Sequence, residues 1–264
     1  MPSSLEKSVE AAELAVFARK KLSLDAAAVE SLPGRFETFS IGGLRASMAT
    51  ADQYDFLNTI EGVTEQSAEA LHDVIQRFPN PCRITVVATS PSRNLTDWLR
   101  ARGYEPVPAR PIAFVRLSVD CNLARRGTKP WRIREALTNE EANLFLDLLD
   151  AGYAAPSDVG ALIRAEHALP AIRGFLASRN GQPLPAAAMS LHATGAVLGG
   201  ASTLPAARGT GAQTALLAHR LSLAEDLGVS LAAATAAPRS PSVRNLTKMG
   251  FTVVERTAWR SPAG

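Results

Sequence analysis

A glycine-rich turn in the second half of the chain constrains the fold more than any other feature. Residues 202–217 read STLPAARGTGAQTALL, a strand end that passes through a proline and two glycines into an amphipathic helix. Glycine permits the positive φ of a tight turn, and the first N–H groups of a helix have no acceptor of their own. Such amides bind anions well. The segment therefore predicts a cradle for the phosphates of a nucleotide-like cofactor, formed by residues 209–214.

The rest of the second half has the element order of a mixed α/β domain. Strands are expected over 131–135, 172–178, 184–192, 196–204, 229–235 and 251–259, and helices over 139–150, 156–169, 210–227 and 240–249. The tripeptide Ala193-Thr194-Gly195 predicts an antiparallel hairpin before the strand that leads into the glycine turn. Gly228 and Gly250 follow the last two helices as C-terminal stops.

The first half of the chain ends in a similar order of elements, which predicts a duplicated fold. A strand over 83–88 leads into the segment Ser90-Pro91-Ser92, which resembles Ser240-Pro241-Ser242, although the literal match of the letters slips by about one helical turn. The expected halves are 1–117 and 131–264, joined by a linker over 118–130. The helix expected over 64–78 is preceded by NTIEGV, without the glycine turn, so the first half is expected to be structural or to face the substrate.

Composition excludes several classes of protein. The 28 basic residues are scattered among 25 acidic ones for a net charge of +3, without the basic stripe that nucleic-acid binding requires. No uninterrupted apolar run reaches the ~18 residues of a membrane span. Two cysteines and four histidines lack the spacing of metal ligands or of a disulfide framework. We therefore expect a cytoplasmic protein with no metal, no nucleic-acid partner and no membrane segment.

Two other phosphate-binding motifs fit the glycine turn less well. Gly209-Thr210-Gly211 with Thr214 approaches the dinucleotide pattern G-x-G-x-x-G, but the strand that follows ends in Thr235-Ala236 without the acidic residue that would hold a ribose. The hairpin strand before the turn also differs from the start of a βαβ unit. The P-loop pattern fails because no Gly-Lys-Ser/Thr follows. A turn that starts a helix without binding any ligand remains the simple alternative.

The same residues carry a resemblance to a known family. Arg208-x-x-Gly211, the helix that ends before Gly228, and the later Gly250-Phe251 pair resemble the GCN5-related N-acetyltransferase (GNAT) superfamily, in the tandem form with a degenerate N-terminal half. The resemblance covers about 131–259 closely and the first half loosely. The family motif is Q/R-x-x-G-x-G/A, and Gln213 departs from it at the last position, where its side chain is expected near the cofactor phosphates.

The resemblance implies a fold and a donor site. The fold class would be α/β (α+β), with two tandem GNAT-like domains, 1–117 and 131–264, each a mixed, mostly antiparallel sheet flanked by helices. The strand 196–204 would part from the strand 229–235, and coenzyme A would bond to the opened edge. The residues implied to contact acetyl-CoA are Ser202, Thr203, Leu204, Arg208, Gly209, Thr210, Gly211, Ala212, Gln213, Thr214 and Asn245.

The implied activity is transfer of an acetyl group from acetyl-CoA to the amine of a small acceptor, by a monomer or a homodimer. The tyrosine that usually donates the proton in this family is replaced by Leu246. Ser242 and Asn245 are the nearby catalytic candidates, although a serine at a helix start is more often a cap. His192, Asp158 and Glu166 are further candidates for the base, with a water relay as the default.

Two other functions stay open at this point. The absent tyrosine favours a non-catalytic acyl-CoA-binding protein of the same fold. The G-x-G pattern leaves a nicotinamide-dependent oxidoreductase as a third hypothesis.

Overall fold

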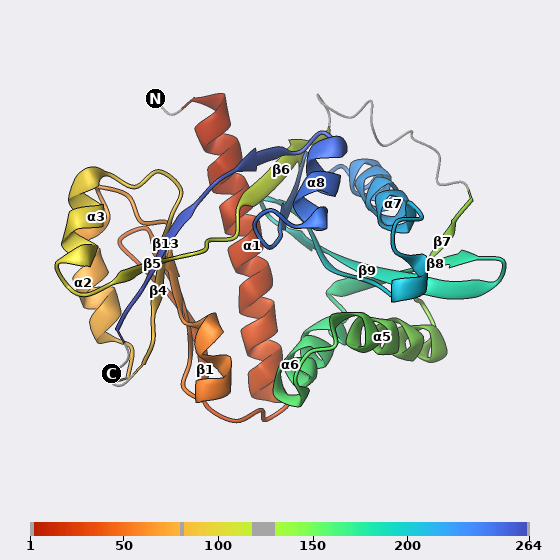
Figure 1. The fold of residues 1–264 in the computed structure, drawn as a ribbon, viewed down its shortest axis with the longest axis horizontal. Coiled ribbons are helices and arrows are strands. Elements are labelled where there is room, and N and C mark those ends of the chain that lie inside the picture. The colour runs from red at the N-terminus through yellow and green to blue at the C-terminus, as the bar shows by residue number, and fades with distance from the viewer. Residues whose placement is uncertain (1–2, 80–81, 118–129, 263–264) are drawn as a thin grey trace. The chain divides into compact units, whose positions relative to one another are not determined.

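The computed structural model describes residues 3–79, 82–117 and 130–262 (Figure 1). The chain divides into two compact units. The large unit comprises Met1–Arg19 and Ile112–Val253, and the small unit comprises Lys20–Pro111 and Val254–Gly264. Each unit holds one mostly antiparallel sheet with helices packed on it, which confirms the predicted fold class.

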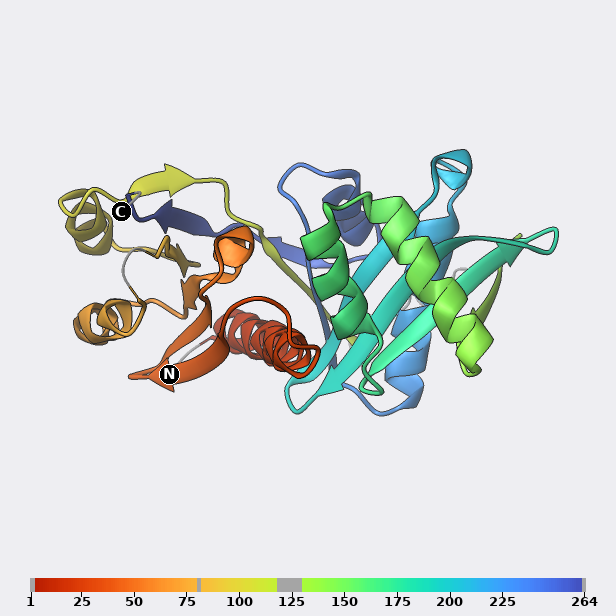
Figure 2. The ribbon, with the colours of Figure 1, turned by 90° about the horizontal axis from the view of Figure 1, so that it is seen from below.

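The large unit is built on a seven-stranded sheet with the strand order β12-β6-β11-β10-β9-β8-β7. Its elements are β6 (Ile112–Arg116), β7 (Arg132–Glu135), α5 (Asn139–Tyr153), α6 (Ser157–His167), β8 (Ile172–Arg179), β9 (Gln182–His192), β10 (Gly195–Thr203), the 3-10 turn η2 (Pro205–Ala207), α7 (Ala212–Asp226), β11 (Leu231–Thr235), α8 (Pro241–Lys248) and β12 (Thr252–Val254). Helices α5 and α6 lie on one face of this sheet, and α7 and α8 lie on the other (Figure 2).

The small unit has a six-stranded sheet with the strand order β1-β2-β3-β4-β13-β5. Its elements are β1 (Phe36–Ile41), β2 (Leu44–Ala49), the 3-10 helix η1 (Asp52–Leu57), β3 (Thr59–Glu61), α2 (Ala68–Gln76), β4 (Thr85–Ala88), α3 (Arg93–Arg100), β5 (Glu105–Val107) and β13 (Thr257–Arg260). A long helix, α1 (Ser4–Val29), contributes its residues up to Arg19 to the large unit and the remainder to the small unit.

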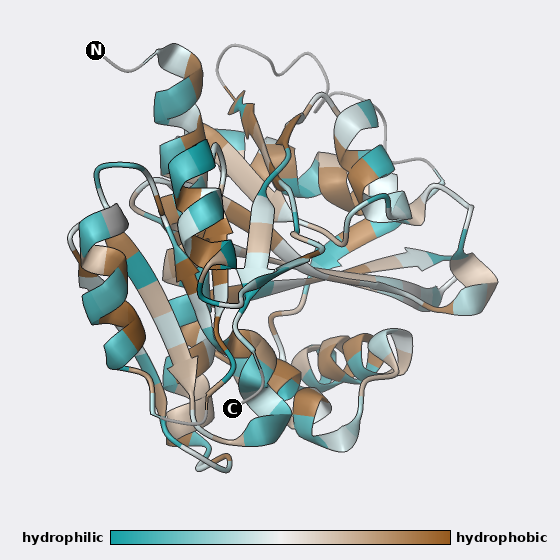
Figure 3. Ribbon diagram, turned by 60° about the vertical axis from the view of Figure 1, so that its left-hand side comes forward, coloured by the Kyte–Doolittle hydropathy of each residue, from teal (hydrophilic) through white to brown (hydrophobic). Residues whose placement is uncertain are grey.

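Each unit has its own apolar core. Apolar and polar residues alternate along the helices in Figure 3, as a single buried helix face requires. In the large unit, Leu216 and Leu221 of α7 are fully buried and pack with Phe175 and Met189 of the sheet. Helix α5 begins at a capping box, in which Thr138 Oγ1 accepts from the N–H of Glu141 and the Glu141 carboxylate accepts from the N–H of Thr138.

The two units repeat the same sequence of elements, as the sequence predicted. In each, a strand leads through a loop and a helix into a parallel strand and a second helix: β3, α2, β4 and α3 in the small unit, and β10, α7, β11 and α8 in the large one. Ser92 caps α3 and Ser240 caps α8. The structurally equivalent serines are therefore Ser92 and Ser240, whereas the letter match aligns Ser90 with Ser240. The two alignments differ by two residues at the caps, which is less than the slip of about one helical turn expected from the sequence.

The halves exchange strands, so the units differ from the predicted boundaries of 1–117 and 131–264. Strand β6 pairs with β11 in the large unit, and β13 pairs with β4 in the small unit. The single strand expected over 251–259 is consequently two strands, β12 and β13, in different sheets. Between them, Arg256 Nε donates to the carbonyl of Arg110 at 2.7 Å, and this bond holds the chain as it changes sheets. Pro108 and Pro111 lie between β5 and β6, where the chain passes from the six-stranded to the seven-stranded sheet, and neither can donate to a ladder.

The predicted linker, 118–130, lies outside the described residues except for its last one. In the part of the chain that the structure describes, no helix combines the length and the apolar character that a membrane crossing needs.

Candidate functional site

The glycine turn has the conformation that its sequence predicts. Gly209 has a φ of +76° and Gly211 a φ of +83°, and Gly211 is the N-cap of α7. A Cβ atom added at either glycine would have no heavy atom within 4 Å. The outer side of the turn is therefore open space, and both glycines are required by backbone conformation rather than by crowding.

The amides of this turn form a run of unused donors. The N–H of Arg208 donates to the carbonyl of Pro205, and the N–H of Ala215 donates to the carbonyl of Gly211. Between them, the backbone N–H groups of residues 209–214 have no acceptor among the described residues. A helix of 15 residues starts here, so its dipole adds to the same positive end. Free amides at a helix N-terminus can bind an anion, and the pyrophosphate expected here stays a prediction.

Side-chain hydrogen bonds hold the glycine turn in place. Thr210 Oγ1 donates to the carbonyl of Ala207 at 2.6 Å, and Trp131 Nε1 donates to the carbonyl of Thr210 at 3.4 Å. Gln213 Nε2 donates to the carbonyl of Ser202 and to Thr203 Oγ1, both at 2.7 Å. Gln213 thus ties the start of α7 to the end of β10, which differs from the expectation that this side chain lies near the phosphates.

Strand β10 parts from its parallel neighbour as the resemblance implied. The ladder between β10 and β11 holds two pairs among the described residues, Ala196 with Ala232 and Val197 with Ala233. β10 then continues as far as Thr203 with β9 as its only ladder partner within the described chain. Beyond Val197, its outer edge has no ladder partner among the described residues, and an unpaired edge of this kind can bond to an extended ligand.

A β-bulge interrupts β10 beside this edge. The register with β9 shifts between Gly199 and Ser202, so Gly200 and Ala201 oppose no residue of the β9 ladder in the described structure. Gly200 has a φ of +57°, and a Cβ atom there would lie 2.2 Å from Nε2 of His167. Gly200 is therefore required both by conformation and by its neighbour.

A buried polar cluster packs on the α6 side of the bulge. Arg19 of α1 donates from Nε to Glu166 at 2.6 Å, and its Nη1 lies 3.2 Å from Ser190 Oγ. Its Nη2 lies 3.1 Å from His167 Nε2. The guanidinium lies flat over Gly199, since Cζ, Nη1 and Nη2 are all 3.7 Å from where a Cβ would stand.

His167 is neutral in this cluster. Its Nδ1 is 2.8 Å from the carbonyl of Ile163 and donates to it, so Nε2 is the acceptor for Arg19. Burial lowers the pKa of His167, and the Arg19 cation lowers it further against the opposing effect of Glu166. His192 joins the cluster through Ser190 Oγ, 2.8 Å from its Nε2, and burial followed by Arg19 lowers its pKa as well.

The cluster unites two residues that the sequence had proposed as bases, Glu166 and His192. Sequence reasoning missed Arg19 and His167. The adjacent glycines Gly199 and Gly200 were the one available sign that side chains approach this strand closely. Asp158, the third proposed base, is exposed in the first turn of α6.

The other predicted residues differ in their exposure and in their hydrogen-bond partners. The side chain of Ser202 is buried and Oγ donates to the carbonyl of Leu148 at 2.8 Å, while Leu204 is partly exposed. Arg208 is exposed, and its Nε donates to the carbonyl of Thr203 at 3.3 Å. The Ser202 and Thr203 carbonyls thus already accept hydrogen bonds within the chain, so a ligand would share them.

Helix α8 carries the remaining candidates. Ser242 is exposed, and Asn245 is half-buried. Ser240, two residues before Ser242, is the cap of this helix, because its side chain accepts from the N–H of Val243. Leu246 is 7% exposed and belongs to the apolar core, so neither its chemistry nor its position provides a proton.

In the small unit, side chains of the unit itself bond to the loop before α2 and to the end of β3, which correspond to the glycine turn and the end of β10. In the loop before α2, the N–H of Thr64 donates to Ser67 Oγ at 2.8 Å and the N–H of Ser67 donates to Thr64 Oγ1 at 3.3 Å. Where β3 leaves β4, Glu61 is buried and paired with Lys20 and Arg256. Burial alone would raise the pKa of Glu61, but the two cations outweigh it and hold the pKa at about 2.

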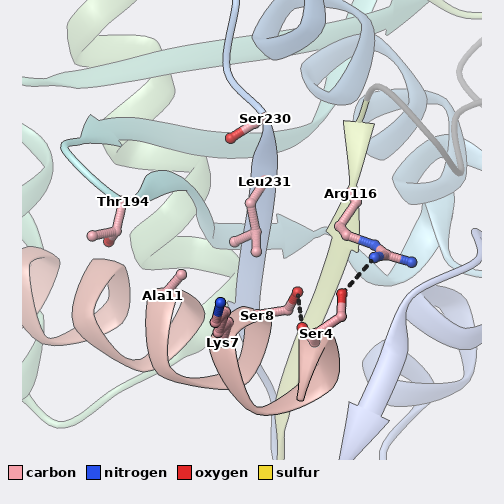
Figure 4. Close-up of a pocket in the computed structure, with 8 residues that line it drawn as sticks. All are labelled: Ser4, Lys7, Ser8, Ala11, Arg116, Thr194, Ser230 and Leu231. Carbon is pink, nitrogen blue, oxygen red and sulfur yellow. Dashed lines mark hydrogen bonds between the residues drawn. The ribbon is translucent and has the colours of Figure 1, made fainter. Parts of the chain in front are cut away.

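A pocket of about 260 Å³ lies elsewhere in the large unit (Figure 4). Arg116 Nη1 donates to Ser4 Oγ at 3.2 Å across it. Its lining consists of Ser4, Lys7, Ser8, Ala11, Arg116, Thr194, Ser230 and Leu231, none of which is a predicted site residue. Among the residues that the structure describes, no group of His, Cys, Asp and Glu is arranged to hold a metal ion.

Comparison with known proteins places the fold. No family model and no curated protein matches the sequence. A GCN5-related N-acetyltransferase from Kribbella flavida matches with a TM-score of 0.58 and 17% identity, over 94% of this chain and 96% of that one. One from Sphaerobacter thermophilus matches with a TM-score of 0.58 and 14% identity, over 98% and 93%.

A third structure carries the tandem arrangement. A tandem GNAT protein from the clavulanic acid biosynthesis pathway matches with a TM-score of 0.51 and 14% identity, over 100% of this chain and 97% of that one. The chain therefore has the fold of the GCN5-related N-acetyltransferases, in tandem form. The resemblance seen in the sequence is confirmed at the level of the fold.

Proposed function

We propose that the protein is an acyl-CoA-dependent N-acyltransferase that transfers an acetyl group from acetyl-CoA to the amine of a small acceptor. The observation that carries the proposal is the run of unused amides at 209–214 beside an opened strand edge, in a GNAT fold. In the equivalent loop of the small unit, Thr64 and Ser67 bond to each other's amides, and residues 58–67 hold a single glycine instead of the pair found at 209 and 211. The large unit is therefore the one proposed to bind the donor.

The residues of the large unit fit coenzyme A in two parts. The amides of 209–214 would hold the pyrophosphate, with Arg208 as an exposed cation beside them. The edge of β10 beyond Val197 would bond to the pantetheine portion, and Asn245 would face it from α8. When bound, acetyl-CoA supplies an acyl group on a thioester, whose C–S bond breaks as the acceptor's C–N bond forms and one proton passes from nitrogen to sulfur through water.

In this proposal, the polar cluster around Arg19 and water molecules carry out the proton transfer. An alkyl ammonium acceptor has a pKa of ~10.4, so it must lose a proton before its nitrogen can react. His192 is neutral at pH 7 because its pKa is lowered, and it is the half-exposed member of the cluster that includes Glu166. Ser242 and Asn245 remain proposed contacts on the cofactor side.

The alternative is a non-catalytic acyl-CoA-binding protein of the same fold. The buried Leu246 favours it, because the position that carries the proton donor in the family here belongs to the core. Thiol release from acetyl-CoA against a panel of amines separates the two functions. Binding measured by calorimetry with no turnover on any amine would support the alternative.

The donor site itself is tested by Gly211→Glu with Gly43→Glu as its control. The two glycines have nearly the same φ, +83° and +84°, and a Cβ at either meets nothing within 4 Å. The substitutions therefore impose the same strain, but only the first puts a carboxylate among the proposed phosphate donors. We expect Gly211→Glu to abolish coenzyme A binding and Gly43→Glu to leave it unchanged. Equal affinities in both variants would refute the placement.

A shift of melting temperature with NADH and none with coenzyme A would instead support a nicotinamide-dependent oxidoreductase.

A further inference from the structure

A buried arginine contacts the bulge of β10 from the α7 side, opposite Arg19. Arg220 of α7 is 3% exposed. Its Nη1 donates to the carbonyl of Ala188 at 2.7 Å and to that of Gly199 at 3.3 Å, and its Nε donates to the carbonyl of Leu216 at 3.2 Å. Within the described residues, each acceptor of this guanidinium is thus a backbone carbonyl.

Arg220 has no carboxylate partner among the described residues. Arg19, on the other side of Gly199, is balanced by Glu166, whereas His167 beside it is neutral. Burial lowers the pKa of Arg220 to about 9, with Arg19 adding to the shift and Tyr153 opposing it, so the group is still a cation at pH 7. The bulge therefore lies beside a buried cation that no carboxylate of the described residues balances.

A buried charge without a counter-ion is unfavourable for folding, and such departures from local rules are expected at functional or strained sites. The neighbouring residues suggest which function. The carbonyl of Gly199 and the N–H of Gly200 belong to one peptide group. A cation that binds the oxygen of a peptide polarises it and makes its N–H a stronger donor. Gly200 opposes no ladder residue in the described structure and stands where β10 has left β11.

We infer that Arg220 is a positioning residue for the reaction proposed above: through the Gly199–Gly200 peptide, its charge strengthens the bulge as a donor to the carbonyl oxygen of a bound thioester. The inference rests on the proposed function. Arg220 exchanges no proton and forms no covalent bond in this role. Negative charge that develops on the carbonyl oxygen is stabilised by a dipole that is already oriented.

A purely structural role for Arg220 is the competing explanation, since the same bonds hold α7 to β9 and β10. The two roles differ in what the bound carbonyl experiences. If the inference holds, the thioester carbonyl is polarised by Arg220 even when no acceptor is present. If Arg220 only holds the helix, a folded variant leaves that carbonyl unchanged.

The experiment is isotope-edited infrared spectroscopy of [1-13C]acetyl-CoA bound to the full chain. In the wild type we expect the thioester C=O band to lie at lower frequency than in free acetyl-CoA. In Arg220→Met the band should return toward the free value, while coenzyme A affinity by calorimetry stays within about threefold because the amides of 209–214 are intact. Arg134→Met, which removes an exposed arginine of β7, is the control and should keep the wild-type band.

Arg220→Lys is the alternative variant if Arg220→Met does not fold. A lysine keeps the charge but loses its proton at lower pH than arginine, so its carbonyl band should move toward the free value as pH rises from 6 to 10, whereas the wild-type band should move less. In turnover with an accepted amine, Arg220→Met should lower kcat about tenfold or more with the KM for acetyl-CoA unchanged.

The outcomes separate the inference from the proposed function. A wild type that fails to bind acetyl-CoA overturns both. A wild type that binds it with an unshifted band, or an Arg220→Met variant that keeps the shifted band, overturns only the role of Arg220. A lysine variant whose band is independent of pH and equal to that of free acetyl-CoA also refutes it.

Discussion

Replacing Gly200 by alanine tests the closest contact around the bulge. An alanine at a φ of +57° costs ~1–2 kcal/mol in backbone strain. The new methyl would also lie 2.2 Å from His167 Nε2, so the imidazole must move. That movement breaks its bonds to the Ile163 carbonyl and to Arg19, at about 1 kcal/mol each. These terms add to a loss in unfolding free energy of about 3–4 kcal/mol, and the approach of the methyl to within 2.9 Å of Ala188 Cβ adds to it.

Gly211→Ala is the matched control for this change. Gly211 also has a positive φ, but its added methyl meets nothing within 4 Å. It should lose only the strain, about 1–2 kcal/mol. The gain from stiffening the unfolded chain is common to both substitutions and cancels in the difference. We therefore expect a difference of about 2 kcal/mol between the variants.

Urea unfolding followed by circular dichroism measures both variants, and a double-mutant cycle assigns the cause. In a His167→Ala background the imidazole is absent, so Gly200→Ala should cost about 2 kcal/mol less than in the wild type. Equal losses for Gly200→Ala and Gly211→Ala, or costs at Gly200 that do not depend on His167, would refute the reasoning.

Two further predictions concern buried charge. Glu61→Gln leaves Lys20 and Arg256 without their carboxylate and should cost about 3–5 kcal/mol of unfolding free energy in urea, more than Glu37→Gln at an exposed pair. The second concerns His167, whose pKa is lowered in the folded state. The unfolded chain then takes up a proton near pH 6.5 while the folded chain does not, so stability should fall as pH drops below about 6.5. The slope between pH 7 and 5 should be smaller in His167→Gln, and an unchanged slope would contradict the assignment.

The sequence predicted the large unit well because its elements are marked by local chemistry. Gly211 and Gly228 delimit α7, and Ser240 and Gly250 delimit α8, so the helices were expected within a few residues of their observed bounds. The amide cradle followed from the same glycines. Positive φ and free helix N–H groups are local properties, and they can be read without knowledge of the fold.

Contacts between residues far apart in the sequence could not be predicted, because local chemistry does not indicate them. Nothing in the letters around Arg19 indicates that it meets Glu166 and Ser190, which are separated from it by 147 and 171 residues. Gln213 was expected near phosphates, because a motif position does not reveal that the side chain reaches Ser202. The split of the expected strand 251–259 depends on a second sheet that accepts its end.

Because β6 and β13 each pair with a strand from the other half of the sequence, the two halves depend on each other to complete their sheets. A cut between residues 117 and 131 would produce two fragments, each carrying a strand whose partner lies on the other fragment. Either fragment by itself would expose an unsatisfied sheet border and tend to aggregate. We therefore expect the two pieces to complement one another when they are co-expressed.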